Sequence, residues 1–161
     1  VVDENGKVKP FVFAAQKRGI KFDLGHGGRS FTWKQAIPSV KQGFIADAIS
    51  SDLHTGSMNS GMKDMANLMS KFLNMGLSVQ DVILRSTWNP ATIINRPDLG
   101  NLDIGSEADV AVFSIAKGDF GFLDISGEKL KGTQKFVAEL TIRAGKIAWD
   151  LNGIAATGKT W

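Results

Sequence analysis

The sequence contains no cysteine, and its 161 residues include only two histidines. The lack of cysteine excludes disulfides and thiolate metal ligands, and it fits a reducing, cytoplasmic location. No apolar run approaches the roughly 20 residues that a membrane helix needs. The opening segment, VVDENGKVKP, also lacks the apolar core of a signal peptide. We therefore expect neither a membrane segment nor disulfides.

Charge of one sign is not concentrated anywhere in the chain. The net charge of +3 arises from 19 basic and 16 acidic residues that are spread along the whole length. No basic stripe or acidic tail stands out, so we expect no nucleic-acid partner. A hydrophobic content of 43% suits one folded domain or slightly more. Because the chain starts at Val1 and not at Met, we expect a piece of a longer protein.

The first half of the chain has the pattern of a βαβ unit. Residues 20–25 and 44–50 are short apolar runs typical of strands, and residues 30–43 between them have the apolar spacing of a helix. Pro38 should bend that helix or delay its start. A strand, a crossover helix and a second strand over about thirty residues indicate a parallel pair with a right-handed connection.

Both histidines follow the predicted strands of this unit. Residues 23–28, DLGHGG, end the first strand, and residues 51–56, SDLHTG, end the second. Parallel strands finish at the same edge of a sheet, so these loops should be neighbours. That edge is where ligands bind in α/β barrels and in open α/β sheets.

The remainder divides into a helical part and a β-rich part. Apolar spacing and capping residues predict helices over residues 10–18, over a methionine-rich stripe from 62 to 73, after a Ser78 and Asp81 capping box, and after Asn89 and Pro90. We interpret the methionines as core packing. Further on, we predict a strand over 108–115, a hairpin turning at Ala144 and Gly145, and mostly loop over 117–134. We place a domain boundary between residues 96 and 97.

The residues at the strand ends allow several roles. Asp52 can bind a metal, transfer a proton or cap the next turn. His26 lies among glycines that let a ligand approach closely, although a glycine-rich turn can also hold a histidine by chance. His54 can face the site or the solvent. DLGHGG is not a phosphate loop, because it lacks the lysine and the following Ser or Thr of that motif.

Asp52, His26 and His54 would be acceptable in kind as zinc ligands. A barrel that holds such loops needs about 250 residues, however, and this chain offers only two of its strands. A complete enzyme therefore does not fit within the sequence.

Five segments, in order, carry a resemblance to a known family: FDLGHGGRSFTW, GFIADAISSDLH, SKFLNMGLSVQDVILRSTWNPA, LGNLDIGSEADVAVF and LTIRAGKIAWDLNGI. Together they resemble the carboxyl-terminal part of the amidohydrolase superfamily, specifically its dihydroorotase-like amidohydrolase/deacetylase group. The resemblance implies an α/β fold. Residues 1–96 would form the last two strands and helices of a (β/α)8 barrel, and residues 97–161 would form the carboxyl-terminal strands of a small β-sandwich.

The resemblance also implies a chemistry. Such proteins hold one or two zinc ions and hydrolyse a C–N bond of an amide, cyclic amide or N-acyl group, with esters also possible, by a hydroxide generated on zinc. Of the family's metal ligands only Asp52 maps onto this chain, as ligand and general acid/base, and the His-x-His pair is missing. His26 is implied to lie beside the substrate.

We therefore assign Asp52 as catalytic residue and metal ligand, and His26, Gly27 and His54 as substrate-binding residues. The expected partner is a small-molecule substrate, and a homo-oligomer is possible. Arg29, Trp33 and Trp88 are candidates for selecting the substrate, although core packing explains both tryptophans equally well. The alternative is a non-catalytic module or fragment that lacks a complete metal site.

Overall fold

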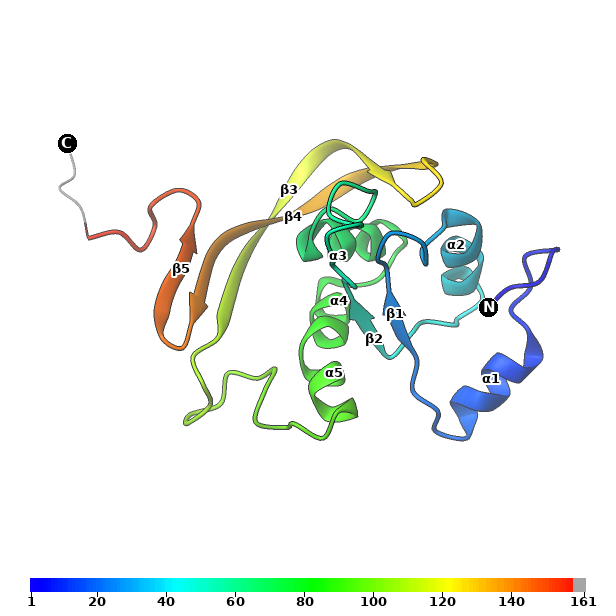
Figure 1. Cartoon of the computed structure of the whole chain (residues 1–161), viewed down its shortest axis with the longest axis horizontal. Coiled ribbons are helices and arrows are strands. Elements are labelled where there is room, and N and C mark those ends of the chain that lie inside the picture. Colours follow the sequence, from blue (N-terminus) through cyan, green and yellow to red (C-terminus); the bar gives the residue numbers. More distant parts are fainter. Residues whose placement is uncertain (158–161) are drawn as a thin grey trace.

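The computed structural model describes residues 1–157 and shows a mixed α/β chain with two separate sheets (Figure 1). The elements are α1 (Pro10–Lys17), β1 (Asp23–Gly25), α2 (Trp33–Lys41), β2 (Ala48–Ser50), α3 (Met65–Asn74), α4 (Val79–Ser86), α5 (Trp88–Ile93), β3 (Val110–Leu123), β4 (Lys129–Arg143) and β5 (Lys146–Asp150). None of the helices in this described part has the length and apolar character needed to cross a membrane.

β1 and β2 form a parallel pair with α2 between them in sequence, which confirms the predicted βαβ unit. Leu24 pairs with Ile49 at the centre of the register. The strands are shorter than predicted, because the Phe22 N–H donates to the carboxylate of Asp47 at 3.0 Å and not to a strand carbonyl. Helix α2 begins at Trp33, so Pro38 lies inside the helix and does not delay its start.

Side chains cap α3 and α4, the first two helices after β2. Ser78 accepts the Asp81 N–H at 3.1 Å and its hydroxyl donates to the Asp81 carboxylate at 2.7 Å, which confirms the predicted cap of α4. Asp64 accepts the Asn67 N–H at 2.6 Å, so α3 begins after the irregular segment and not at the first methionine of the stripe. Helix α5 begins at Trp88, two residues before the predicted proline position.

The segment predicted as loop, residues 117–134, is instead the closed end of a long hairpin. Strands β3 and β4 stay paired from Lys117 and Gln134 to Leu123 and Lys129. The prediction was wrong because glycines and lysines obscure an alternation of apolar residues, Phe120, Phe122 and Leu130, which pack on the core. The predicted hairpin is confirmed, with Ala144 and Gly145 at φ 47° and 74° between β4 and β5.

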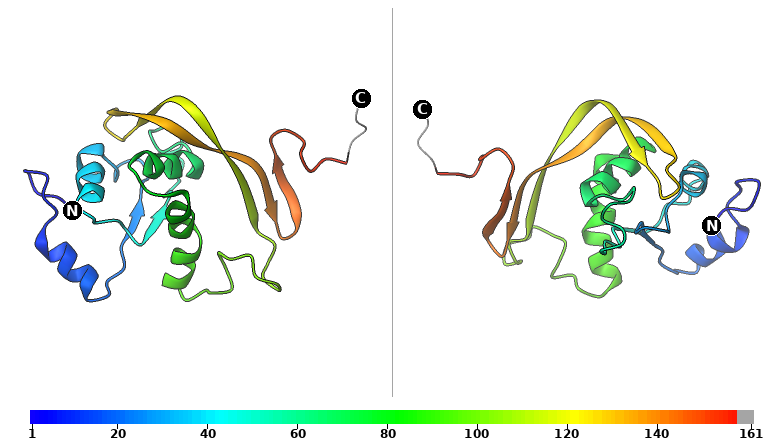
Figure 2. Two further views of the ribbon diagram at one scale, coloured as in Figure 1. Left: turned by 180° about the vertical axis from the view of Figure 1, so that it is seen from behind. Right: turned by 45° about the horizontal axis from the view of Figure 1, so that its top comes forward.

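One apolar core joins the two sheets. Buried Phe31, Phe72, Phe122 and Phe136 come from the loop before α2, from α3, from β3 and from β4, and they belong to one cluster. Figure 2 shows the β3–β4 ribbon crossing over α3 in both views. The boundary near residue 97 stays a prediction, because the packing is continuous across it.

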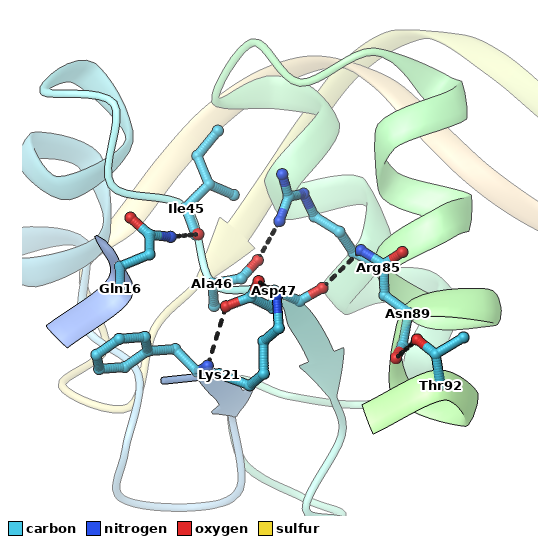
Figure 3. A network of polar contacts seen from close by, with 9 residues as sticks. Gln16, Lys21, Ile45, Ala46, Asp47, Arg85, Asn89 and Thr92 are labelled. Carbon is cyan, nitrogen blue, oxygen red and sulfur yellow. Dashed lines mark hydrogen bonds and ion pairs between the residues drawn. The ribbon is translucent and has the colours of Figure 1, made fainter. Parts of the chain in front are cut away.

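A polar network fixes the amino end of β2 (Figure 3). The Asp47 carboxylate pairs with the Lys21 ammonium at 3.1 Å, and the Asp47 carbonyl accepts from Asn89 at 2.9 Å. The Arg85 guanidinium donates to the Ala46 carbonyl. These contacts tie α4 and α5 to the start of β2, and they leave the carboxyl end of the strand to the loops described next.

Candidate functional site

The loops that follow β1 and β2 lie side by side, as the βαβ pattern predicts. Beyond the last paired residues, the His26 N–H donates to the Ser50 carbonyl at 3.1 Å, and the Gly27 N–H donates to the Ser51 carbonyl at 2.9 Å. The parallel ladder thus extends into both loops. It brings residues 26–28 against residues 50–52 at the carboxyl edge of the sheet.

Asp52 lies directly over the backbone of Gly27. A Cβ atom placed on Gly27 would be 2.2 Å from Asp52 Oδ2, so the carboxylate occupies space that only a glycine leaves open. Both residues have left-handed backbones, with φ 48° at Asp52 and φ 47° at Gly27. A non-glycine residue at positive φ is uncommon and is often found at functional sites.

The Asp52 side chain is exposed, and its carboxylate oxygens accept no hydrogen bond from residues 1–157. Only its backbone carbonyl is engaged, by the Ser57 hydroxyl at 3.3 Å. The carboxylate is therefore not a helix or turn cap. It is free to bind a cation or to exchange a proton with a ligand.

The segment from His54 to Asp64 follows β2 and contains turns but neither helix nor strand. Its inner anchor is Ser57, which is fully buried and whose hydroxyl accepts the His54 N–H at 3.0 Å. The His54 ring is exposed, and its Nδ1 accepts the Gly56 N–H at 3.1 Å. His54 thus bonds within its own turn, and its substrate-binding role stays a prediction.

His26 is fully buried, and both of its ring nitrogens are engaged. Nδ1 lies 2.9 Å from the Gly27 carbonyl, and Nε2 lies 2.8 Å from the Lys71 ammonium nitrogen. Because a carbonyl only accepts, Nδ1 carries the hydrogen and Nε2 accepts from Lys71. The ring also stacks on Phe31 with 4.5 Å between centroids. In this arrangement the His26 ring holds the Gly27 carbonyl by a hydrogen bond. The predicted contact of His26 with substrate stays a prediction.

Lys71, which the sequence analysis did not single out, is the other buried polar group of the site. It projects from α3 and is 0% exposed. Its ammonium donates to the carbonyls of Gly61 at 2.7 Å and Leu123 at 2.6 Å as well as to His26. The sequence does indicate that Lys71 is buried, because it lies three residues after Leu68 and thus on the apolar face of the predicted helix.

Burial and the charge of Lys71 lower the pKa of His26 from 6.5 to about 4. Burial also lowers the pKa of Lys71, to about 8. The carboxylate of Asp124 opposes both changes, and the charge of Lys63 adds to the shift at Lys71. His26 is therefore neutral at pH 7, as its role of acceptor toward an ammonium requires.

This shift predicts that the folded chain loses stability in mild acid. Below pH 6.5 the unfolded chain binds a proton on His26, and the folded chain does not do so until about pH 4. Between these values acid favours unfolding, by roughly 3 kcal/mol in total for about two and a half pKa units. Urea unfolding between pH 7 and pH 4 measures this loss.

The wild type is compared with two variants, His26→Gln and His54→Gln. Carboxylates also titrate between pH 7 and pH 4, but they do so in all three proteins and therefore do not affect the comparison. We expect the loss of unfolding free energy to be smaller in His26→Gln alone. Equal losses in wild type and His26→Gln would contradict the assignment of a neutral buried imidazole.

The other candidates divide between core and surface. Trp33 is buried, and its Nε1 donates to the carbonyls of Phe122 and Glu128, both at 3.1 Å, so it packs in the core. Trp88 is 38% exposed and Arg29 is exposed. Across residues 1–157 no three His, Cys, Asp or Glu side chains come close enough together to hold a metal ion.

Comparisons with known proteins show what the chain is similar to. The sequence model of the amidohydrolase family matches residues 32–148. A deacetylase of Agrobacterium fabrum is 38% identical over 110 residues, and a deacetylase of Brucella anthropi is 37% identical over the same length. These alignments cover 68% of this chain and 27% of each relative.

A deacetylase of Enterococcus faecalis is 30% identical over 142 residues, which cover 88% of this chain and 38% of the relative. The chain thus spans between 27% and 38% of the length of these relatives.

Two solved structures align with most of the chain. A crystal structure of an adenine deaminase has a TM-score of 0.83 and 30% identity, over 89% of this chain and 39% of that one. A crystal structure of a dihydroorotase has a TM-score of 0.77 and 34% identity, over 87% of this chain and 37% of that one. The mixed α/β chain therefore aligns with part of amidohydrolase-fold structures.

Proposed function

Because the chain belongs to the amidohydrolase family, we propose that it is part of a metal-dependent hydrolase that cleaves C–N bonds. In this proposal β1 and β2 are the last two strands of a (β/α)8 barrel, and β3 to β5 are the carboxyl-terminal share of a small β-sandwich. The parallel pairing of β1 and β2 and the alignment with about two fifths of two related structures support this placement.

The observation that carries the proposal is the position of Asp52. Its carboxylate lies at the carboxyl end of β2, exposed and without a hydrogen-bond donor among the described residues. The left-handed backbone of Asp52 directs the carboxylate to this position, and the absence of a side chain at Gly27 leaves room for it. We assign it two roles, that of metal ligand and that of proton carrier.

The chain supplies one suitable metal ligand, Asp52, but not a complete metal site, because no group of three suitable side chains exists within residues 1–157. In the proposal the remaining ligands come from other parts of the full gene product. Zinc, when bound, would lower the pKa of a water molecule and polarise the substrate carbonyl.

Asp52 then moves the proton in this mechanism. One of its carboxylate oxygens accepts a proton from the attacking water, and the C–N bond breaks as the tetrahedral carbon collapses. Asp52 returns the proton to the leaving nitrogen, so that the carboxylate is restored. The substrate class is an amide, cyclic amide or N-acyl group, with an ester as a further possibility, and the three relatives named deacetylases favour a substrate that carries an acetyl group.

The test uses the full gene product. Its zinc content is measured, and hydrolysis is assayed with N-acetyl amino acids, dihydroorotate, adenine and an aryl acetate, before and after chelation. We expect stoichiometric zinc and turnover of at least one substrate, with loss of turnover on chelation and recovery with added zinc. Protein without bound zinc, or turnover that is unchanged by chelation, would contradict the proposal.

The second candidate is a non-catalytic module or a fragment that lacks a complete metal site. The absence of a three-residue ligand cluster in residues 1–157 favours it for the isolated chain. Both candidates expect the 161-residue chain alone to lack stoichiometric zinc, so the full gene product separates them. Stoichiometric zinc with hydrolase activity there would exclude the non-catalytic module, and a full gene product without zinc or activity would support it.

A further inference from the structure

We infer that Lys71 is a positioning residue whose ammonium group fixes the His26 ring and joins the loops after β1 and β2 to the end of β3. This inference rests on contacts within the chain and does not need a bound metal. Only its consequence for Asp52 rests on the proposed function.

The ammonium group of Lys71 has three hydrogens and meets three acceptors. These are Nε2 of His26 at 2.8 Å, the Gly61 carbonyl at 2.7 Å and the Leu123 carbonyl at 2.6 Å. The acceptors come from the loop after β1, the loop after β2 and the last residue of β3. One fully buried side chain therefore connects three segments that are distant in sequence.

The surroundings are shaped to receive this ammonium group. It lies over the rings of Phe31 and Trp33, 5.2 Å and 5.8 Å from their centroids, where an aromatic face attracts a cation. A Cβ atom on Gly61 would lie 2.6 Å from the carbonyl oxygens of Leu123 and Asp124. Only a glycine therefore lets the loop after β2 approach the hairpin closely enough to share the lysine.

The contacts continue from Lys71 to Asp52. Lys71 donates to Nε2 of His26, and the Nδ1–H of the same ring donates to the Gly27 carbonyl. The backbone of Gly27 lies against the Asp52 carboxylate. Loss of Lys71 would remove the hydrogen bond to Nε2 and would leave the ring held by Phe31 and the Gly27 carbonyl alone, which would weaken the support of the loop beside Asp52.

Nuclear magnetic resonance of the 161-residue chain tests the inference, because only two histidines contribute signals. A His54→Gln variant assigns them. In the wild type at pH 7 we expect His26 to have hydrogen on Nδ1 alone, with an Nε2 resonance typical of a nitrogen that accepts a hydrogen bond. A wild-type His26 with hydrogen on Nε2 would overturn the inference without any substitution of Lys71.

The variant Lys71→Met removes the donor and keeps the length of the side chain, and Lys41→Met is the matched control on an exposed lysine of another helix, α2. In Lys71→Met we expect the Nε2 resonance to move to the position of a nitrogen without a hydrogen bond. Amide exchange over residues 51–64 should accelerate about tenfold or more, which corresponds to the loss of one hydrogen bond. An unchanged Nε2 resonance in folded Lys71→Met would overturn the inference.

The two proposals fail in different ways. Failure of the proposed function would appear as full activity of an Asp52 variant in the full gene product. Failure of the present inference would appear in the His26 signals of the chain alone, whether or not zinc is present.

Discussion

Replacement of Asp52 by Asn in the full gene product should lower kcat/KM by a factor of at least about 100, because a general acid/base contributes about 10² to 10⁴ to the rate. Asparagine has nearly the same shape and also tolerates a left-handed backbone, so the fold should be retained. It cannot hold a proton between the two steps, and it is a poorer ligand for zinc. Steady-state kinetics and zinc analysis measure both losses.

The control for this prediction is Asp103→Asn. Asp103 is an exposed carboxylate in the segment between α5 and β3, and its side chain forms no hydrogen bond within residues 1–157. We expect this variant to retain wild-type activity and zinc. If Asp52→Asn retained them as well, neither role of Asp52 would stand.

The second large effect is expected for Gly27→Ala. The added Cβ would lie 2.2 Å from Asp52 Oδ2, so the carboxylate must move. The left-handed backbone at φ 47° adds strain of about 1 to 2 kcal/mol for a residue with a Cβ atom. Because a misplacement of about 1 Å costs on the order of a hundredfold in rate, we expect that loss in kcat/KM.

Gly28→Ala is the matched control in the same loop. Its φ is not positive, and a Cβ atom there would meet its nearest neighbours, the Gly56 carbonyl oxygen and Ser57 Cβ, at an ordinary 3.5 Å. We expect near wild-type kinetics and stability. Similar losses in both variants would mean that the loop tolerates no side chain in general, and the specific role of Gly27 would be wrong.

The placement of Asp52 was accessible from sequence because it depends on local pattern and chain topology. A βαβ unit has parallel strands, so the residues after β1 and β2 had to meet at one edge, and the structure pairs Gly25 with Ser50 there. The contact between Gly27 and Asp52 is a finer consequence of the same topology. It needed the left-handed backbones of both residues, which the sequence alone does not determine.

The burial of His26 could not be predicted in the same way. Whether a histidine in a glycine-rich loop points outward or inward depends on what packs beneath it, and here Phe31 and Lys71 do so. Lys71 lies 45 residues further along the chain. Local pattern predicted its helix, but only tertiary packing brings its ammonium group under the loop.

The error over residues 117–134 has a related origin. Glycine and lysine are infrequent in strands, and their density suggested a loop. Pairing with a long partner strand and burial of Phe122 against the core outweighed these preferences. Lys129 and Lys131 remain on the exposed side of the hairpin, which is why their charge does not oppose the fold.

We propose that this chain contributes Asp52 to a zinc site. Anomalous diffraction at the zinc edge, from crystals of the full gene product, shows whether it does. We expect a zinc peak about 2.0 to 2.2 Å from a carboxylate oxygen of Asp52. A bound zinc ion with Asp52 outside coordination distance, or crystals of active protein without a zinc peak, would contradict it.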